Sequence, residues 1–517
     1  MDAKFTRRWF LAAAGAAYLT LASTVSCDLL KRTSKVARLR TPKARGLQSP
    51  KVLPLPNALP TPPDEVWALR SRPYLSPPSV EVTKQERGTT PGYVFVGPEK
   101  GDAGQGGSLI VDDQGQVVWF RPLASKYGRP MDFKMQYYRG RRVLTWVEMV
   151  TGEYVVFDDS YRKIVRFKAA NGYSGDHHEF LISPQDTALI TIYDSVPRDL
   201  SSFGGPANGV AMQGIAQELD IETGEVLFEW HSFEHVGLDE TYGKPGEDED
   251  YPGLDYFHIN SIDVDHDNNL LISARKTSAV YKIDRESGEI IWRLGGKRSD
   301  FEMGPGAWFA FQHDARRQPD GTISIFDNGS TIFRNGLARV VEESRGIVLE
   351  LDEQKMTASL VREYTHPDKK YADAAGNLQI LPNGNAFVGW GRALAVSEFS
   401  KDGNLLFDAK LPARNRSYRA FRFPWSAHVG GQPAAAAERT SEEEVRVYAS
   451  WNGATEVATW EVFAGPSPNR LESLGSVPRD GFETAMVALT SAPWVAAQAR
   501  DGSGRVLGST DPVKLRT

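Results

Sequence analysis

Residues 256–261 read YFHINS, residues 270–275 read LLISAR and residues 290–296 read IIWRLGG. A second stretch repeats this order, with FQHD at residues 311–314, PDG at 319–321 and IFDNG at 325–329. Each copy places a histidine, His258 or His313, just before a short apolar run that is followed by a turn and another apolar run. Short apolar runs bounded by turn residues are typical of β-strands. Two histidines at matching places of two repeats predict one central site.

The same alternation of strand and turn recurs from residue 92 to about residue 423. One half of the repeat is a polar turn before an apolar run: DDQGQVVW at residues 112–119, DIETGEVLF at 220–228 and DRESGEIIW at 284–292. The other half joins two apolar runs through Asp-Gly or Asn-Gly, as at Asp320-Gly321 and Asn383-Gly384, which is a strong hairpin signal. About six copies at spacings of roughly 50–70 residues predict a six-bladed β-propeller over residues 64–423. Propellers bind ligands at the central channel, through loops at one end.

The pattern changes after Phe423. Apolar alternation returns at the short spacing of a small β-sandwich, at residues 446–453, 457–463, 486–489, 494–499 and 505–509. We therefore expect a C-terminal sandwich of the fibronectin III or immunoglobulin kind over residues 424–517. The predicted fold class is all-β, a propeller followed by this sandwich.

Composition excludes several classes of protein. A length of 517 residues predicts two or three domains, and 41% hydrophobic with 24% charged residues is typical of a globular protein. The net charge of −6 offers no basic face, so we expect no nucleic-acid partner. Cys27 is the single cysteine, which excludes an intramolecular disulfide and a cysteine metal cage. No metal and no cofactor is predicted.

The N-terminus resembles an export signal. Arg7 and Arg8 precede an apolar run from Trp9 to Val25, the layout of a twin-arginine signal over residues 1–27. An uncleaved anchor helix is the alternative, because the run is near the short limit for a membrane span. Residues 24–27, TVSC, resemble a lipoprotein processing box that would put a lipid on Cys27 and tether the protein to a membrane surface. Ordinary cleavage would instead give a free secreted protein. Residues 28–63 are basic and proline-rich, and are predicted to be a linker.

Several motifs together resemble one known family: FHINS (257–261), SAR (273–275), WRLGG (292–296), QHD (312–314), FDNG (326–329), VGWG (388–391) and SWNGAT (450–455). Through them the chain resembles the arylsulfotransferase-like family, in its fungal and actinobacterial branch, over nearly all of the residues after the linker. The resemblance implies a six-bladed propeller with its site in the channel. It also implies transfer of a sulfuryl group from an aryl sulfate to a phenol, without a nucleotide donor, through a transiently sulfated histidine.

The resemblance also implies site residues. His258 and His313 match two histidines of the family, and Arg334 is the first candidate for its sulfate-binding arginine, with Arg339 and Arg345 as competitors. Guanidinium groups suit the oxyanion that sulfuryl transfer builds. The expected substrate-binding residues are Asn260, Arg275, Asp327, Asn328, Trp390 and Arg392.

One family histidine is missing. The family's sulfated histidine lies on a later blade, where this chain reads VGWGRA at residues 388–393. Either His258 or His313 is then the nucleophile, or transfer is direct, or the reaction differs. Aromatic residues near the motifs are expected to stack on an aryl ring: Tyr256, Phe257, Trp308 and Phe309.

Two other functions stay open on the sequence. The chain could be a noncatalytic extracellular propeller that binds an anionic or aromatic ligand, or a quinone-dependent dehydrogenase, whose docking repeats resemble residues 284–292. His177 and His178 resemble a pair of ligands, but adjacent residues of a strand point to opposite faces, so they cannot both face one site if that segment is extended. The sequence leaves the oligomeric state open.

Overall fold

The computed structural model describes residues 51–55, 66–101, 104–123, 129–247, 253–330, 339 and 341–516. The export signal, Cys27, Arg334 and residues 28–50 lie outside these ranges. The described residues are mostly β-strands, which confirms the all-β class. The helical turns are α1 (Ser232–His235), η1 (Ser201–Phe203), η2 (Leu238–Glu240) and η3 (Gly391–Ala393). No helix within these ranges is long and apolar enough to cross a membrane.

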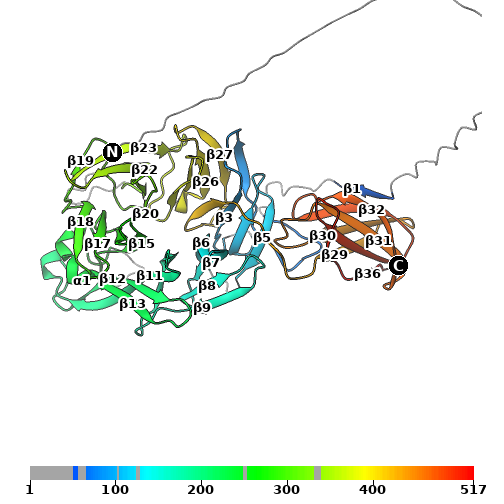
Figure 1. The fold of residues 1–517 in the computed structure, drawn as a ribbon, viewed down its shortest axis with the longest axis horizontal. Coiled ribbons are helices and arrows are strands. Elements are labelled where there is room, and N and C mark those ends of the chain that lie inside the picture. Colours follow the sequence, from blue (N-terminus) through cyan, green and yellow to red (C-terminus); the bar gives the residue numbers. More distant parts are fainter. Residues whose placement is uncertain are drawn as a thin grey trace, which may run out of the picture. The chain divides into compact units, whose positions relative to one another are not determined.

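Six sheets, each built on four antiparallel strands, follow one another along residues 81–423 and surround a common centre (Figure 1). Within each sheet the strands are named from the inner strand outward. The first four sheets are β28-β3-β4-β5, β6-β7-β8-β9, β10-β11-β12-β13 and β15-β16-β17-β18. The last two are β20-β21-β22-β23, extended by β19, and β24-β25-β26-β27, extended by β2. The strands of the first three sheets are β28 (Ala420–Phe423), β3 (Tyr93–Val96), β4 (Gly107–Val111), β5 (Val117–Pro122), β6 (Pro130–Tyr138), β7 (Arg141–Glu148), β8 (Glu153–Phe157), β9 (Lys163–Phe167), β10 (Gly175–Ile182), β11 (Thr187–Arg198), β12 (Gly209–Asp220) and β13 (Val226–His231), with β14 (Leu254–Asp255) beside β12.

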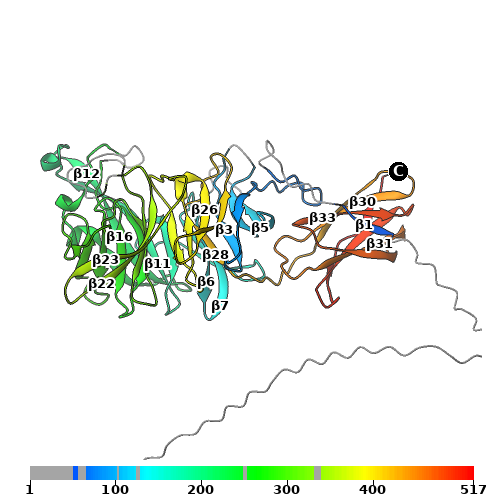
Figure 2. The ribbon, with the colours of Figure 1, turned by 90° about the horizontal axis from the view of Figure 1, so that it is seen from above.

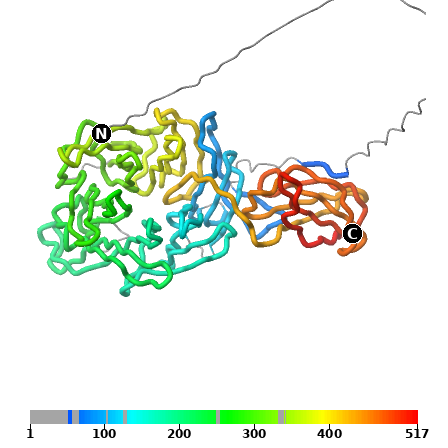
Figure 3. The backbone as a smooth tube through the Cα atoms, in the orientation of Figure 1, coloured from blue at the N-terminus to red at the C-terminus, as the bar shows by residue number. Residues whose placement is uncertain are grey.

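The strands of the other three sheets are β15 (Ile259–Val264), β16 (Leu270–Ala274), β17 (Ala279–Ile283), β18 (Ile290–Gly295), β20 (His313–Arg317), β21 (Ile323–Asp327), β22 (Arg345–Asp352), β23 (Thr357–Thr365), β19 (Glu302–Met303), β24 (Asn377–Ile380), β25 (Ala386–Gly389), β26 (Ala395–Phe399), β27 (Leu405–Lys410) and β2 (Glu81–Gln85). The chain closes this ring with its last strand, because β28 pairs with β3 in the register Phe421↔Phe95. Figure 3 shows the early, blue part of the ring beside this late segment.

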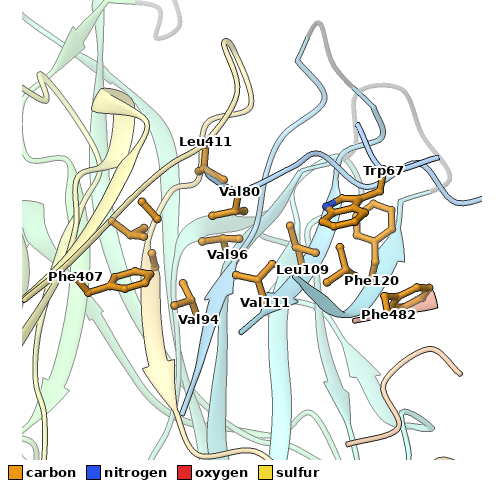
Figure 4. Packing of buried hydrophobic residues seen from close by; sticks show 14 of the residues in the cluster. Trp67, Val80, Val94, Val96, Leu109, Val111, Phe120, Phe407, Leu411 and Phe482 are labelled. Atoms are coloured by element: carbon orange, nitrogen blue, oxygen red, sulfur yellow. The ribbon is translucent and has the colours of Figure 1, made fainter. Parts of the chain in front are cut away.

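Apolar residues fill the space between each sheet and the next. Phe95 and Ile110 of the first sheet pack with Phe133 and Trp146 of the second, and similar clusters join the second to the third and so on around the ring. A last cluster joins the sixth sheet to the first, through Phe407 beside residues such as Val94, Val96 and Leu109 (Figure 4). Each sheet therefore buries both faces, and the six inner strands are held around one axis.

The repeated polar turns form as predicted. The carboxylate of Asp112 accepts hydrogen bonds from the backbone N–H groups of Gln114 and Gln116. Asp220 and Asp284 do the same for the residues two and three positions further on. A short acidic side chain that caps its own turn explains why the motif recurs.

Residues after 431, joined by a strand at residues 52–54, form two further sheets around their own apolar core (Figure 2). The first is β1-β33-β30-β29, with β1 (Val52–Pro54), β33 (Glu483–Leu489), β30 (Glu444–Ser450) and β29 (Ala434–Arg439). The second contains β32 (Arg470–Pro478), β31 (Thr459–Ser467), β34 (Trp494–Arg500), β35 (Val506–Ser509) and β36 (Val513–Lys514). β1 differs from the sequence expectation, since residues 52–54 of the predicted linker pair with β33 as a strand. The side chain of Asn452 contacts the ring through both backbone groups of Phe120.

Candidate functional site

A cavity of about 1260 Å³ lies where the inner strands of the ring begin. Its lining includes residues at or just before the first residues of β6, β10, β15, β20, β24 and β28. Of the predicted site residues, His258, His313, Arg275 and Arg392 line it. Four side chains that were not predicted for the site also line it: His177, His178, Tyr193 and Tyr418.

Irregular backbone turns these side chains toward the cavity. The register shifts at the start of β6, β10, β15 and β20, and such bulges re-aim side chains beside active sites. His258 has a φ of 57° and Asp314, next to His313, also has 57°. Non-glycine residues with positive φ cost about 1–3 kcal/mol each and gather at functional sites. The strained residues are therefore His258, just before β15, and the neighbour of His313 on β20.

His258 is held by a carboxylate. Its Nδ1 lies 2.5 Å from Oδ2 of Asp255, which ends β14. Burial, with His178 and Arg275 nearby, holds the pKa of His258 well below its usual value. Burial also raises the pKa of Asp255 to about 6, against the opposing effect of Lys276. A neutral imidazole that donates from Nδ1 carries its lone pair at Nε2, the atom a nucleophile uses.

His313 is held by an amide. Its Nδ1 lies 2.7 Å from Oδ1 of Asn328, and Asn328 in turn donates to the backbone oxygens of Ala372 and Ala375. The N–H of Ala375 lies 3.3 Å from Nε2 of His313. Burial and the charge of Arg275 hold the pKa of His313 well below its usual value. Asn328 therefore fixes the orientation of His313 through its hydrogen bond to Nδ1.

His177 and His178 both line the cavity, because the segment that bears them is not a regular extended strand. Between the pairs Gly175↔Ile192 and Phe180↔Ile190, residues 176–179 of β10 face a single residue of β11. This irregularity, in which four residues face one, breaks the alternation of an extended strand. The two rings stack with centroids 4.3 Å apart, and both Nδ1 atoms approach the carboxylate of Asp176. Burial lowers the pKa of His177 to about 4.

Two tyrosines flank the histidines. The ring of Tyr193 lies 5.3 Å from His178 and 5.4 Å from His258, between centroids. Tyr418 lies 5.4 Å from His178 and 6.3 Å from His313. Burial raises the pKa of Tyr418 well above its usual value, so its hydroxyl stays protonated. These rings, and not the predicted aromatic residues, offer stacking surfaces for an aryl group.

Positive charge predominates on the wall of the cavity. Arg275 donates to the backbone oxygen of Asp373 at 3.0 Å, and Arg392 approaches the carboxylate of Asp373 at 3.2 Å. The cationic side chains in the lining are Lys100, Arg129, Arg275, Lys276, Arg392 and Arg416, against the acidic Glu99, Asp176, Glu247 and Asp373. Six cations against four acids leave the lining with a small excess of positive charge, which favours an anionic ligand.

A buried network of charges lies behind the cavity. Its members follow the lining residues in the chain: Glu179 follows His178, Asp314 follows His313 and Arg419 follows Tyr418. Arg419 pairs with Asp132 at 2.8 Å and Glu179 at 3.2 Å, and both acids also bind Lys134. Burial would raise the pKa of Glu179, but Arg316, Arg419 and Lys134 hold it well below its usual value. The network fixes the inner strands relative to one another.

The remaining predicted residues lie outside the cavity lining. Asn260 is fully buried and donates to the backbone of Gln312. Asp327 accepts from Arg339 and Arg345, so these two competitors for the sulfate-binding role are tied to a buried carboxylate. Trp390 is fully buried and donates to Ser397. Arg334 lies outside the described residues. The aromatic residues Tyr256, Phe257 and Phe309 are buried in the cores between sheets.

The residues that sequence reasoning missed carried a weak signal. Asp176 and Asp255 precede His178 and His258 by two and three positions, which is the order of a carboxylate that orients an imidazole. Tyr418 stands just before the inner strand β28, as His258 stands just before β15. That position in the repeat identifies the cavity lining better than the residue type does.

Comparisons with known proteins agree with the motifs. The model of the arylsulfotransferase (ASST) family matches residues 134–412, which is more than half of the chain. No curated protein matches.

Similar solved structures include a protein of unknown function from Bacteroides caccae, with 12% identity, a TM-score of 0.38, and coverage of 65% of this chain and 99% of that one. They also include virginiamycin B lyase from Staphylococcus aureus, with 9% identity, a TM-score of 0.33, and coverage of 79% and 99%. Both TM-scores are low, and these likenesses support no functional argument. The family match covers His177, His178, His258 and His313, and this chain belongs to the arylsulfotransferase (ASST) family.

Proposed function

We propose that this protein transfers a sulfuryl group from an aryl sulfate to a phenolic acceptor within the cavity. The observation that carries the proposal is the convergence of four histidines with a surplus of cationic side chains in one cavity. An aryl sulfate offers both an anionic group for these cations and a ring for Tyr193 and Tyr418. Family membership supports the same substrate class.

The proposed nucleophile is His258. Asp255 holds its Nδ1–H, so Nε2 attacks the sulfur, the S–O bond to the aryl group breaks, and the electron pair leaves with the aryloxide. The aryloxide then takes a proton from water. In the second half the phenol oxygen attacks the sulfur, the S–N bond breaks, and the phenolic proton passes to water. Arg275 and Arg392 offset the charge that grows on the nonbridging oxygens.

The test uses an aryl sulfate donor whose released phenol is coloured, with a second phenol as acceptor. We expect turnover in the wild type and a loss of at least about 10³-fold in His258→Ala, as for removal of a nucleophile. His231→Ala is the matched control, because His231 also pairs with a carboxylate, Glu229 at 3.0 Å, but is absent from the cavity lining. Mass spectrometry of the wild type trapped with donor alone should find a sulfated His258. Equal turnover in His258→Ala would overturn the assignment.

A noncatalytic role in binding an anionic or aromatic ligand is the second candidate. It is favoured by residues 388–393, where only Arg392 lines the cavity and the histidine expected from the resemblance is missing. Calorimetric binding of an aryl sulfate without any turnover, weakened by Arg275→Met, would support this role instead.

We also infer that the ring of six sheets is a six-bladed β-propeller, because each sheet shares a core with the next and the last with the first. The two C-terminal sheets are proposed to be a sandwich of the fibronectin III or immunoglobulin kind. Export and a lipid on Cys27 remain proposals from the sequence, as do the domain boundaries.

A further inference from the structure

We propose that Asp176, His177 and His178 bind a divalent transition-metal ion, with Zn²⁺ as the best match, on the wall of the cavity. One ligand atom from each residue lies within 4.8 Å of the others. Two imidazoles and one carboxylate form a three-ligand set that suits Zn²⁺ with an open fourth position, and suits Mg²⁺ and Ca²⁺ poorly. His177 and His178 take no step in the proposed sulfuryl transfer, so the metal site goes beyond that function.

The spacing of the ligand atoms is close to what a metal requires. Nδ1 of His177 lies 3.3 Å from one oxygen of Asp176, and Nδ1 of His178 lies 2.5 Å from the other. Ligands about 2.0–2.2 Å from a common Zn²⁺ stand roughly 3–3.5 Å from one another. The first distance fits directly, and the second has to open by roughly 0.5–1 Å.

The carboxylate is already oriented. Oδ2 of Asp176 accepts from the backbone N–H of His178 at 2.9 Å and from the hydroxyl of Thr191 at 3.2 Å. Groups of this kind, behind the ligands, fix a ligand's direction and raise its affinity for metal. The side chains of Asp176, His177 and His178 keep 8%, 18% and 7% of their surface exposed, so an ion can enter from the cavity while most of each ligand is shielded.

The backbone supports the same conclusion. A regular strand would send His177 and His178 to opposite faces, and the bulge in β10 instead stacks their rings 4.3 Å apart. The bulge removes ladder pairs, and the freed N–H groups of Glu179 and Phe180 bond to side chains, those of Thr191 and Asp132. A bulge that the surrounding side chains stabilise, and that places two imidazoles beside one carboxylate, is best explained by a ligand for all three.

The proposal is tested with the full chain, without a polyhistidine tag, stripped with a chelator and titrated calorimetrically with Zn²⁺ in the absence of sulfate ester and phenol. We expect one equivalent to bind, no competition from a hundredfold excess of Mg²⁺, and a visible absorption band when Co²⁺ replaces Zn²⁺. His177→Ala should weaken Zn²⁺ binding at least tenfold. His177→Gln keeps the size of the side chain and should weaken binding similarly, which covers the case in which the alanine variant fails to fold.

His231→Ala is again the matched control, since it removes an imidazole that lies beside a carboxylate outside the cavity. Unchanged affinity in this control, with loss in the His177 variants, supports the site. An absence of Zn²⁺ binding, or equal affinity in wild type and His177→Gln, overturns it. Because the titration contains no aryl sulfate, neither result depends on whether sulfuryl transfer occurs.

Discussion

His258 shows how position decides the chemistry of a residue. Histidine in water titrates near neutral pH, but here burial and the nearby His178 and Arg275 keep the imidazole neutral. The partner of this imidazole is the buried carboxylate of Asp255, whose pKa is raised to about 6. The pair shares one proton between Nδ1 of His258 and Oδ2 of Asp255, which lie 2.5 Å apart. In the proposed reaction Asp255 therefore controls the nucleophilicity of His258.

We predict an acid limb near pH 6 in the rate of sulfuryl transfer. Below that pH Asp255 is protonated and no longer accepts the Nδ1–H of His258, so the rate should fall as the pH drops through about 6. The folded-state pKa lies above the unfolded value of about 3.9. Between these values the folded state binds more protons, so lowering the pH here stabilises the fold through this group. The buried His177, His258 and His313 have lowered pKa values and act in the opposite direction, because they destabilise the fold as the pH falls. Tryptophan fluorescence recorded at each pH therefore has to show that the protein stays folded where the rate is lost.

The measurement is kcat/KM against pH for the wild type and Asp255→Asn. The variant should be slower by about 10²-fold or more and should lack the limb. A limb that persists in Asp255→Asn would assign it to another group. Asp373→Asn, at the rim beside Arg392, serves as a comparison that should alter KM for the sulfate ester and leave the limb in place.

The sequence placed His258 and His313 together because both occupy the same point of a repeat. The sequence did not reveal that His177 and His178 share a site. The bulge that brings them together depends on side chains of neighbouring strands, which accept hydrogen bonds from its backbone N–H groups. Asn260 and Trp390 have fully buried side chains and are absent from the cavity lining. Motif membership identifies a segment, and the direction of each side chain depends on local backbone geometry.

At the scale of elements, the inner strands are coupled through buried charge. Arg419 on the approach to β28, Glu179 on β10 and Asp132 on β6 come from three different sheets. Removing one partner from a buried ion pair leaves an uncompensated charge, at a cost of about 3–5 kcal/mol. Sequence reasoning predicted the turns, which are encoded locally by residues such as Asp112 and Gly115. It could not predict this network, whose partners are separated by up to 287 positions.

We predict that Arg419→Met lowers the free energy of unfolding by about 3–5 kcal/mol. Urea denaturation followed by tryptophan fluorescence measures this. Arg139→Met is the matched control, because its pair with Glu222 is exposed on both sides, at 59% and 56%, and should leave the midpoint nearly unchanged. Equal midpoints for the two variants would show that the network contributes little to stability.

At the scale of the whole molecule, closure of the ring joins distant parts of the chain. β28 completes the sheet that begins with β3, and β1 joins the C-terminal sheet through β33. The repeats predicted a ring of similar units, since each unit has its own turn signals. They did not predict which strands close it, because pairing across more than 300 positions leaves no local pattern.

We predict that Phe95→Ala lowers the free energy of unfolding by about 3–5 kcal/mol, as for a buried aromatic residue. The ring of Phe95 is fully buried and contacts Phe423 and Trp425, with centroids 5.4 and 6.2 Å away, so its loss weakens the closing contact. Leu227→Ala, on the outer strand β13 with 52% exposure, should change stability by less than about 0.5 kcal/mol. Calorimetric scans should show a lower Tm for Phe95→Ala alone, and similar scans for both variants would contradict the role of closure.

The last prediction concerns where the whole molecule resides. The twin-arginine pattern and TVSC at residues 24–27 lead us to expect export followed by lipidation of Cys27, and each buried acyl CH₂ contributes about 0.8 kcal/mol to membrane affinity. Wild-type protein should incorporate labelled palmitate and sediment with membranes. Cys27→Ala should lose both while still being exported, because the arginines remain. Arg7→Lys with Arg8→Lys should instead retain the protein inside the cell with its signal uncleaved. If Cys27→Ala sediments as the wild type does, the anchor is an uncleaved helix and not a lipid.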